Sequence, residues 1–199
     1  KEQMIKEMEK IGITNYTFFK AIKPSESEIP KDFYANHSFS ISWKIGSYGC
    51  MLSHYNIIKI SKEKNYKKIL VLEDDCIFTD NDFINISNNL LENIQYDAVW
   101  FGGTHKRKGV KINNNLYKIY KTKTTHSMLF TSTVFDFILK NMKEYNICVD
   151  AFYASFLQKK FNCLVTIPHL CIQREDYSNI INKNTFYNIN STIKTLIGE

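Results

Sequence analysis

A short apolar run that ends in three acidic residues constrains the fold of this chain more than any other feature. The run, Ile69–Leu72, has the length of a strand, and an unbroken apolar run is typical of a parallel strand buried on both faces. Glu73, Asp74 and Asp75 follow it directly. Neighbouring carboxylates repel one another, so a fold that packs them together needs a cation or hydrogen-bond donors. The sequence therefore predicts a buried strand with a polar site at its end.

This acidic end has two interpretations. Glu73 and Asp75 are two residues apart, a spacing that places both side chains on one side just beyond a strand. Together they could hold a hard divalent cation such as Mg²⁺ or Mn²⁺, which prefers oxygen ligands. Alternatively, the acidic residues form a turn in which Asp75 or Asp80 caps the next helix. The tripeptide alone leaves both interpretations open.

Helical and strand-like patterns alternate along the rest of the chain. We expect helices over residues 1–10, 46–61, 81–94, 134–142 and 149–161, and strands over 16–22, 69–72, 97–103, 116–120, 127–131 and 164–167. This alternation favours an α/β fold with a mostly parallel sheet flanked by helices. The length of 199 residues fits one domain, which we place over 1–181, followed by a polar C-terminal tail over 182–199.

Composition argues against two classes of protein, those that bind nucleic acids and those that span a membrane. The net charge is +6, but nearly all the positive residues are Lys, and Arg, which reads bases best, is scarce. No nucleic-acid-binding module is recognisable, so we expect no nucleic-acid partner. No apolar run approaches the ~20 residues of a transmembrane segment. The five cysteines are odd in number and form no CxxC motif, which predicts reduced thiols and a cytoplasmic location.

Two stretches with glycines are further candidates for a site. Gly46 and Gly49 lie at a predicted helix start, where free N–H groups could face an anion. His54, further along that helix, is either a core histidine or a ligand. Gly102 and Gly103 follow a predicted strand, where they either let the backbone approach a ligand closely or form a turn.

The first glycine stretch, the acidic strand end and the second glycine stretch follow one another along the chain, and in this order they resemble the motifs of glycosyltransferase family 25. The matching segments are GSYGCMLSH, LVLEDD and YDAVWFGG, which follow the family's pattern of G-x-x-G-C-x-x-S-H, a strand ending in E-D-D, and a strand followed by Gly. Later matches are Val149-Asp150, Ile167-Pro168, Gln173 and the stretch from Tyr177 to Ile180. The resemblance covers about residues 1–181. Family members usually begin with a strand ahead of the first helix, and this sequence has no counterpart of it.

The resemblance implies a GT-A-like fold, a nucleotide-sugar donor and inversion at the anomeric carbon. Glu73 and Asp75 would bind Mn²⁺ or Mg²⁺, with His169 as a candidate third ligand unless it is a surface imidazole. Asp150 would be the catalytic base, unless it only caps a helix. The residues that we expect to bind the donor are Gly46, Gly49, Ser53, His54, Glu73, Asp74, Gly102 and Gly103. Cys50 belongs to the same family signature, without an assigned role.

The partners implied by the resemblance are a UDP-sugar, either UDP-galactose or UDP-glucose, and an acceptor hydroxyl. The acceptor could be a glycan, a lipopolysaccharide or hydroxylysine in a collagen-like protein. The alternative is a glycosyltransferase-like domain without activity that serves as a structural or interaction module.

Overall fold

The computed structural model describes residues 1–34, 39–174, 177–178, 183–184 and 188–198. Its helices are α1 (Glu2–Lys10), α2 (Ile41–Glu63), α3 (Phe83–Leu91), α4 (Phe135–Asn141), α5 (Val149–Phe152), α6 (Gln158–Lys160) and α7 (Ile189–Ile197). A π-helical segment, Tyr153–Leu157, joins α5 to α6. The strands are β1 (Lys68–Leu72), β2 (Cys76–Phe78), β3 (Ala98–Trp100), β4 (Thr104–His105), β5 (Val110–Lys111), β6 (Leu116–Lys118), β7 (Thr122–Lys123), β8 (Ser127–Thr131), β9 (Cys163–Thr166), β10 (Cys171–Gln173), β11 (Tyr177–Ser178) and β12 (Lys183–Asn184).

The central sheet has six strands in the order β1-β8-β3-β9-β6-β5. Within it β3 and β9 pair in parallel, and every other neighbouring pair is antiparallel. The fold class is therefore α/β, but the expectation of a mostly parallel sheet is wrong. β10 pairs with β2 beside this sheet, so Gln173 lies opposite Cys76.

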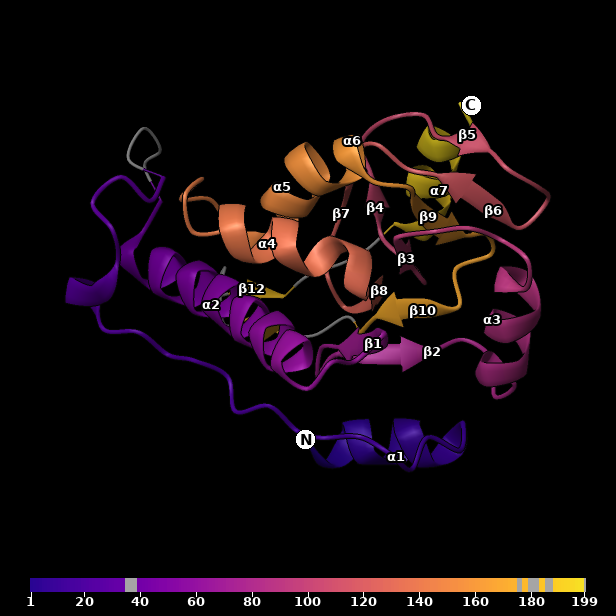
Figure 1. Cartoon of the computed structure of the whole chain (residues 1–199), viewed down its shortest axis with the longest axis horizontal. Helices are drawn as coiled ribbons and strands as arrows, with labels where there is room; N and C mark the ends of the chain where they lie inside the picture. Colours follow the sequence, from indigo (N-terminus) through magenta and orange to yellow (C-terminus); the bar gives the residue numbers. More distant parts are fainter. Residues whose placement is uncertain (35–38, 175–176, 179–182, 185–187, 199) are drawn as a thin grey trace.

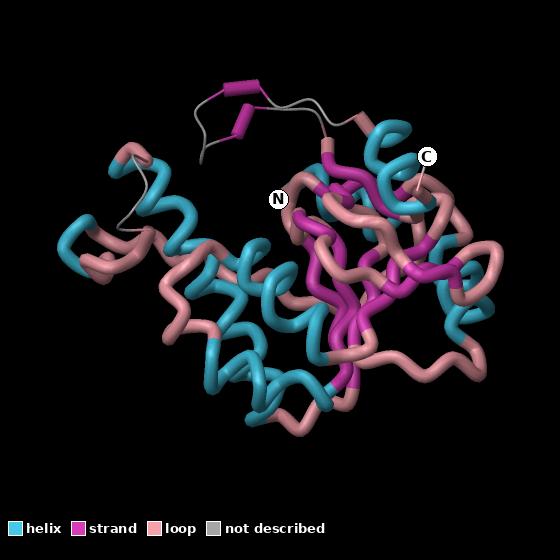
Figure 2. Tube along the Cα trace, turned by 90° about the horizontal axis from the view of Figure 1, so that it is seen from above, coloured by secondary structure: helices cyan, strands magenta, loops and turns pink. Residues whose placement is uncertain are grey.

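Burial on both faces of the sheet explains why the strands have the unbroken apolar runs that are typical of parallel strands. Trp100 and Phe130 belong to the core that includes Met51 of α2, whereas Val99 belongs to a second core that includes Met4 of α1. Figure 1 shows α2, α4 and α5 together on one side of the strands, with α1 and α3 elsewhere around them, and Figure 2 shows helices on both sides of the strands. A strand covered on both faces is apolar throughout whether its neighbours are parallel or antiparallel.

The long helix α2 begins earlier than predicted. Ser40 is its N-cap and accepts a hydrogen bond from the Trp43 N–H, so the helix starts at Ile41 rather than near Gly46. Gly46 and Gly49 consequently lie inside the helix. The expectation that they sit at a helix start, with free N–H groups facing an anion, is therefore wrong.

Residues 16–22 form no strand, contrary to the prediction. The Ile22 N–H donates to Ser53 Oγ at 2.9 Å, so this segment is bonded to α2 rather than to a neighbouring strand. A Cβ atom at Gly49 would lie only 2.4 Å from the Ile22 carbonyl oxygen. The absence of a side chain at Gly49 therefore lets this segment pass directly over the helix.

The C-terminal end is more ordered than the predicted polar tail. Residues 189–197 form α7, and the Leu196 side chain is fully buried in the core on the α2 side of the sheet. The predicted boundary at 181 and 182, and the motif residues Asn179 and Ile180, lie outside the described residues. Among the described helices, none has both the length and the apolarity to cross a membrane. All five cysteines are free.

Candidate active site at the end of β1

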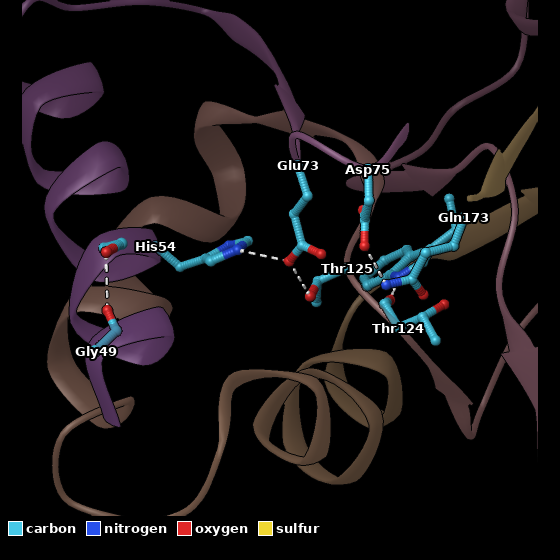
Figure 3. A network of polar contacts seen from close by, with 9 residues as sticks. Gly49, His54, Glu73, Asp75, Thr124, Thr125 and Gln173 are labelled. Atoms are coloured by element: carbon cyan, nitrogen blue, oxygen red, sulfur yellow. Dashed lines mark hydrogen bonds and ion pairs between the residues drawn. The ribbon is translucent and has the colours of Figure 1, made fainter. Parts of the chain in front are cut away.

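Glu73, the first residue after β1, contacts two polar side chains (Figure 3). Its Oε1 accepts a hydrogen bond from Thr125 Oγ1 at 2.6 Å and lies 3.5 Å from His54 Nε2. Its backbone N–H donates to the carbonyl of His126, which continues the pairing of β1 with β8. Burial opposes ionisation of Glu73, but the contacts with His54 and Thr125 outweigh it, so the pKa of Glu73 lies below its ordinary value.

Asp75 turns to a different partner, Gln173 at the end of β10 (Figure 3). Gln173 Nε2 donates to Asp75 Oδ2 at 2.6 Å, and the Arg174 N–H donates to the backbone carbonyl of Asp75 at 2.8 Å. Burial, together with the charge of Glu73, raises the pKa of Asp75 to about 6. The turn and the end of β10 are thus held together by both main chain and side chain.

Two oxygen atoms at this contact have no partner. Asp75 Oδ1 and Gln173 Oε1 are both buried and accept no hydrogen bond from the described part of the chain. A buried acceptor without a partner costs about 1–3 kcal/mol unless something supplies the missing positive charge. One carboxylate oxygen and one amide oxygen are suitable ligands for Mg²⁺ or Mn²⁺. The residues present therefore fit a hard divalent cation held by Asp75 and Gln173.

The predicted metal ligands have different partners in the structure. Glu73 faces His54, and Asp74 is exposed. His169 is 6% exposed, which excludes a surface imidazole, and it contacts another histidine, His105. The alternative helix-cap interpretation is also excluded for Asp75, because α3 has Asp82 as its N-cap.

A pocket of about 530 Å³ lies beside this site, lined by Gly103, His105, His126, His169 and Gln173 among others. His105 Nε2 and His169 Nε2 are 3.0 Å apart, and His105 Nδ1 is 2.7 Å from Thr122 Oγ1. Burial, and then the charge of His169, lowers the pKa of His105 to about 3. Burial, and then the charge of His126, lowers the pKa of His169 to about 4. The histidine pair is therefore neutral at physiological pH.

Asp150 lies in the first turn of α5 but does not cap it. Cys148 is the N-cap residue, and its thiol donates to Asp150 Oδ1 at 2.8 Å while lying 2.9 Å from the Tyr34 hydroxyl. Burial raises the pKa of the Cys50 thiol, and the charges of Glu73 and Asp150 raise it further. Asp150 is therefore fixed at the start of α5 by the Cys148 thiol.

Three of the predicted donor-binding glycines, Gly49, Gly102 and Gly103, make close contacts within the protein, as does Ser53. A Cβ at Gly102 would lie 2.0 Å from the Cys171 carbonyl oxygen, and one at Gly103 would lie 2.6 Å from Thr122 Cγ2. Ser53 Oγ donates to the Gly49 carbonyl at 2.8 Å. These residues set the spacing between elements, and of them Gly103 lines the pocket.

Sequence reasoning did not assign a site role to four residues that the structure places here, Thr125, His126, His105 and Gln173. Thr125 and His126 precede β8, which pairs with β1 and so delivers both to the acidic turn. Gln173 was recognised only as part of a family motif. Its signal was its place near the end of a strand, and the pairing of β10 with β2 that brings it to Asp75 could not be read from the sequence.

A family model and one curated relative agree with the resemblance. The sequence model of glycosyltransferase family 25 (LPS biosynthesis protein) matches residues 1–155. A Drosophila melanogaster protein named glycosyltransferase 25 family member is 39% identical over 61 residues, which are 29% of this chain and 10% of that protein. The crystal structure of A197 from STIV aligns with a TM-score of 0.43 and 14% identity, over 69% of this chain and 75% of that one. The family match extends over most of the chain, which therefore belongs to glycosyltransferase family 25.

Proposed function

We propose that this protein is a metal-dependent, inverting glycosyltransferase that moves galactose or glucose from a UDP-sugar to an acceptor hydroxyl. The observation that carries the proposal is the pair of unpartnered buried oxygens, Asp75 Oδ1 and Gln173 Oε1. They lie at the end of a strand whose acidic motif corresponds to the metal-binding motif of the GT-A fold. Family membership supports the same reaction class.

The pocket next to Gln173 is the proposed donor site. Gln173 lines the pocket and contacts Asp75, so a sugar diphosphate in the pocket would lie beside the proposed metal ligands. Lys106 also lines the pocket and can face the negative diphosphate. A divalent cation on Asp75 and Gln173 would stabilise the negative charge that develops on the leaving diphosphate.

Asp150 is the proposed base. In the reaction the acceptor oxygen bonds to the anomeric carbon, the bond from that carbon to the diphosphate breaks, and the acceptor proton passes to the carboxylate. The Cys148 thiol holds Asp150 Oδ1, which fixes the carboxylate and leaves Oδ2 to take the proton.

Aromatic rings near Asp150 are the proposed place for the acceptor. The rings of Phe39 and Trp43 stack at 3.9 Å, and Tyr34, which contacts Cys148, packs edge-on against both. Aromatic faces of this kind bind the apolar face of a sugar ring. We therefore favour a glycan or lipopolysaccharide acceptor, with hydroxylysine as the alternative. The five free thiols support a reducing compartment such as the cytoplasm.

Calorimetric titration of UDP into the chain, first with Mn²⁺ and then with EDTA, tests the proposal. We expect saturable binding with Mn²⁺ only, and we expect Asp75→Asn to weaken it at least ~100-fold, since it removes a charged metal ligand. Glu92→Gln is the matched control, because Glu92 is an exposed acid that follows α3 and its loss should leave UDP binding unchanged. Binding that is insensitive to EDTA, or absent in a folded sample, would overturn the metal-dependent mechanism and favour an inactive module.

A further inference from the structure

Three side chains of types that bind metals, those of Cys50, His54 and Glu73, lie close together between α2 and the end of β1. Cys50 and His54 are four residues apart on α2, so both project from the same face of that helix. The thiol of Cys50, a ring nitrogen of His54 and a carboxylate oxygen of Glu73 all lie within 4.8 Å of one another. The residues therefore offer one sulfur, one nitrogen and one oxygen ligand from two separate elements, α2 and the end of β1.

The distance between His54 and Glu73 fits shared coordination better than a direct hydrogen bond. His54 Nε2 and Glu73 Oε1 are 3.5 Å apart. A charge-assisted N–H···O bond is about 2.7–2.9 Å long. Two ligands at about 2.0–2.2 Å on a tetrahedral ion are separated by roughly 3.3–3.6 Å. The observed separation corresponds to one edge of such a tetrahedron.

The ligand set also indicates which ion it would bind. Thiolate and imidazole suit Zn²⁺ and Co²⁺, whereas Mg²⁺ and Mn²⁺ prefer the oxygen ligands found at Asp75 and Gln173. Three protein ligands leave a fourth tetrahedral position open, as in zinc sites that keep a water molecule or a substrate atom. The Glu73 side chain is 24% exposed, so an ion can reach the cluster from solvent.

A buried hydroxyl without a partner lies next to the cluster. Tyr153 is fully buried, its hydroxyl accepts or donates no hydrogen bond within the described residues, and its ring lies 6.0 Å from the His54 ring. Burial raises the pKa of this hydroxyl, and the negative charge of Glu73 raises it further. Tyr153 begins the π-helical segment, a rare conformation that is frequent at functional sites. A water molecule or anion in the fourth position would give the hydroxyl its missing partner.

We infer that Cys50, His54 and Glu73 form a binding site for a thiophilic divalent cation of the zinc class, with the fourth position beside Tyr153. The site is separate from the oxygen pair of Asp75 and Gln173, and the inference does not depend on the proposed function. Binding would release the thiol proton of Cys50 and connect α2 to the end of β1, so it would stabilise the fold.

Cobalt spectroscopy on the metal-free, reduced chain tests this inference in the absence of nucleotide. Thiolate bound to tetrahedral Co²⁺ gives a near-ultraviolet sulfur-to-cobalt band together with intense visible bands. We expect these bands to saturate at about one Co²⁺ per chain, to disappear when Zn²⁺ is added, and to be lost in Cys50→Ser. Cys148→Ser is the matched control, because Cys148 is also partly buried and lies outside the cluster, and the bands should persist in it.

Further variants keep the test decisive. His54→Gln and Glu73→Gln should each weaken Co²⁺ binding at least ~10-fold, which covers the case in which Cys50→Ser does not fold. Asp75→Asn should keep the bands while it loses Mn²⁺-dependent UDP binding, so failure of one site is distinguishable from failure of the other. The absence of a sulfur-to-cobalt band in the folded chain, or a band that persists in Cys50→Ser, overturns the inference.

Discussion

The end of β1 and the neighbouring histidine pocket are both buried clusters of titratable groups, yet they adopt opposite charge states. Glu73 keeps its charge, because His54 and Thr125 more than offset the cost of burial and lower the pKa of its carboxyl. His105 and His169 lose theirs, because burial and the neighbouring histidine charge lower their pKa values to about 3 and about 4. Burial opposes the charged form in both regions, and the sign of the neighbouring groups differs between them.

Asp75 lies between these two cases. It is less buried than the two histidines. Burial raises its pKa, and the charge of Glu73, which has the same sign, raises it further, to about 6. A carboxylate held in this way is destabilised as long as no cation is present. The neighbours of Glu73 therefore stabilise its charge, whereas those of Asp75 do not.

Acidification should have the largest effect of the changes considered. It should lower the free energy of unfolding through the histidine pair. The folded pKa values of His105 and His169 lie below the ordinary 6.5, so the unfolded chain binds protons first and stability falls as pH drops below about 6.5. Between pH 7 and pH 5 each histidine should remove about 2 kcal/mol from the free energy of unfolding. Urea unfolding at pH 7, 6 and 5 measures this loss.

His169→Gln provides the control for this prediction. Gln can still hydrogen-bond to His105 but does not titrate, so about half of the pH-dependent loss should vanish. An unchanged dependence on pH in His169→Gln would mean that other groups cause the acid sensitivity. Because Asp75 gains stability on acidification, both proteins are best compared in the Asp75→Asn background.

Gly102→Ala should disturb both regions at once. A Cβ at this position would lie 2.0 Å from the Cys171 carbonyl and 3.0 Å from His126 Nε2, so β10 must move. That movement would displace Gln173 from Asp75 and His169 from His105. We expect a loss of about 3 kcal/mol in the free energy of unfolding, at the upper end for overpacking.

Gly12→Ala separates this steric effect from backbone strain. Gly12 has a φ of +74° but nothing within 4 Å of the Cβ position. Its replacement should cost only about 1 kcal/mol, the ordinary penalty for a left-handed residue. Equal losses in the two variants would show that β10 does not depend on close packing at Gly102.

The pattern of the sequence predicts the elements well where burial is periodic. The strand at 127–131 is confirmed with its exact bounds, and the acidic end of β1 lies where the apolar run placed it. The direction of the strands was not predictable, because a sheet covered on both faces has apolar strands in either case.

The site was predictable only where its residues are close in sequence. The carboxylates 73–75 could be recognised from their spacing, whereas Cys50 entered only through the family signature and was not paired with His54. Their partners Thr125 and Gln173 come from the starts and ends of distant strands, and only the pairings of β8 with β1 and of β10 with β2 bring them together. The contact of His169 with His105 was not predicted, because the short strand β4, which carries His105, was not foreseen.

Asp75→Asn should stabilise the metal-free protein, because it removes a charge that burial and Glu73 disfavour. The folded pKa of Asp75 lies above the ordinary 3.8, so wild-type stability falls as pH rises from about 4 through about 6. In metal-free buffer the variant should be about 2 kcal/mol more stable than wild type at pH 7, and equally stable near pH 3.5. Thermal unfolding at both pH values measures the difference, and a variant that is less stable at pH 7 would contradict the assigned strain.

Tyr153→Phe should have the smallest effect, and its sign is informative. The Tyr153 hydroxyl is buried without a partner, so removing it from the metal-free protein should stabilise the fold by about 1 kcal/mol. Tyr34→Phe removes a hydroxyl that contacts Cys148 at 2.9 Å, and it should destabilise by a similar amount. If Cys50, His54 and Glu73 hold an ion whose fourth ligand reaches Tyr153, the gain in Tyr153→Phe should shrink when Zn²⁺ is added, because only wild type then satisfies its hydroxyl. Thermal unfolding of both variants with and without Zn²⁺ measures this difference. A gain that is identical with and without Zn²⁺ would show that the fourth position of the ion lies away from Tyr153.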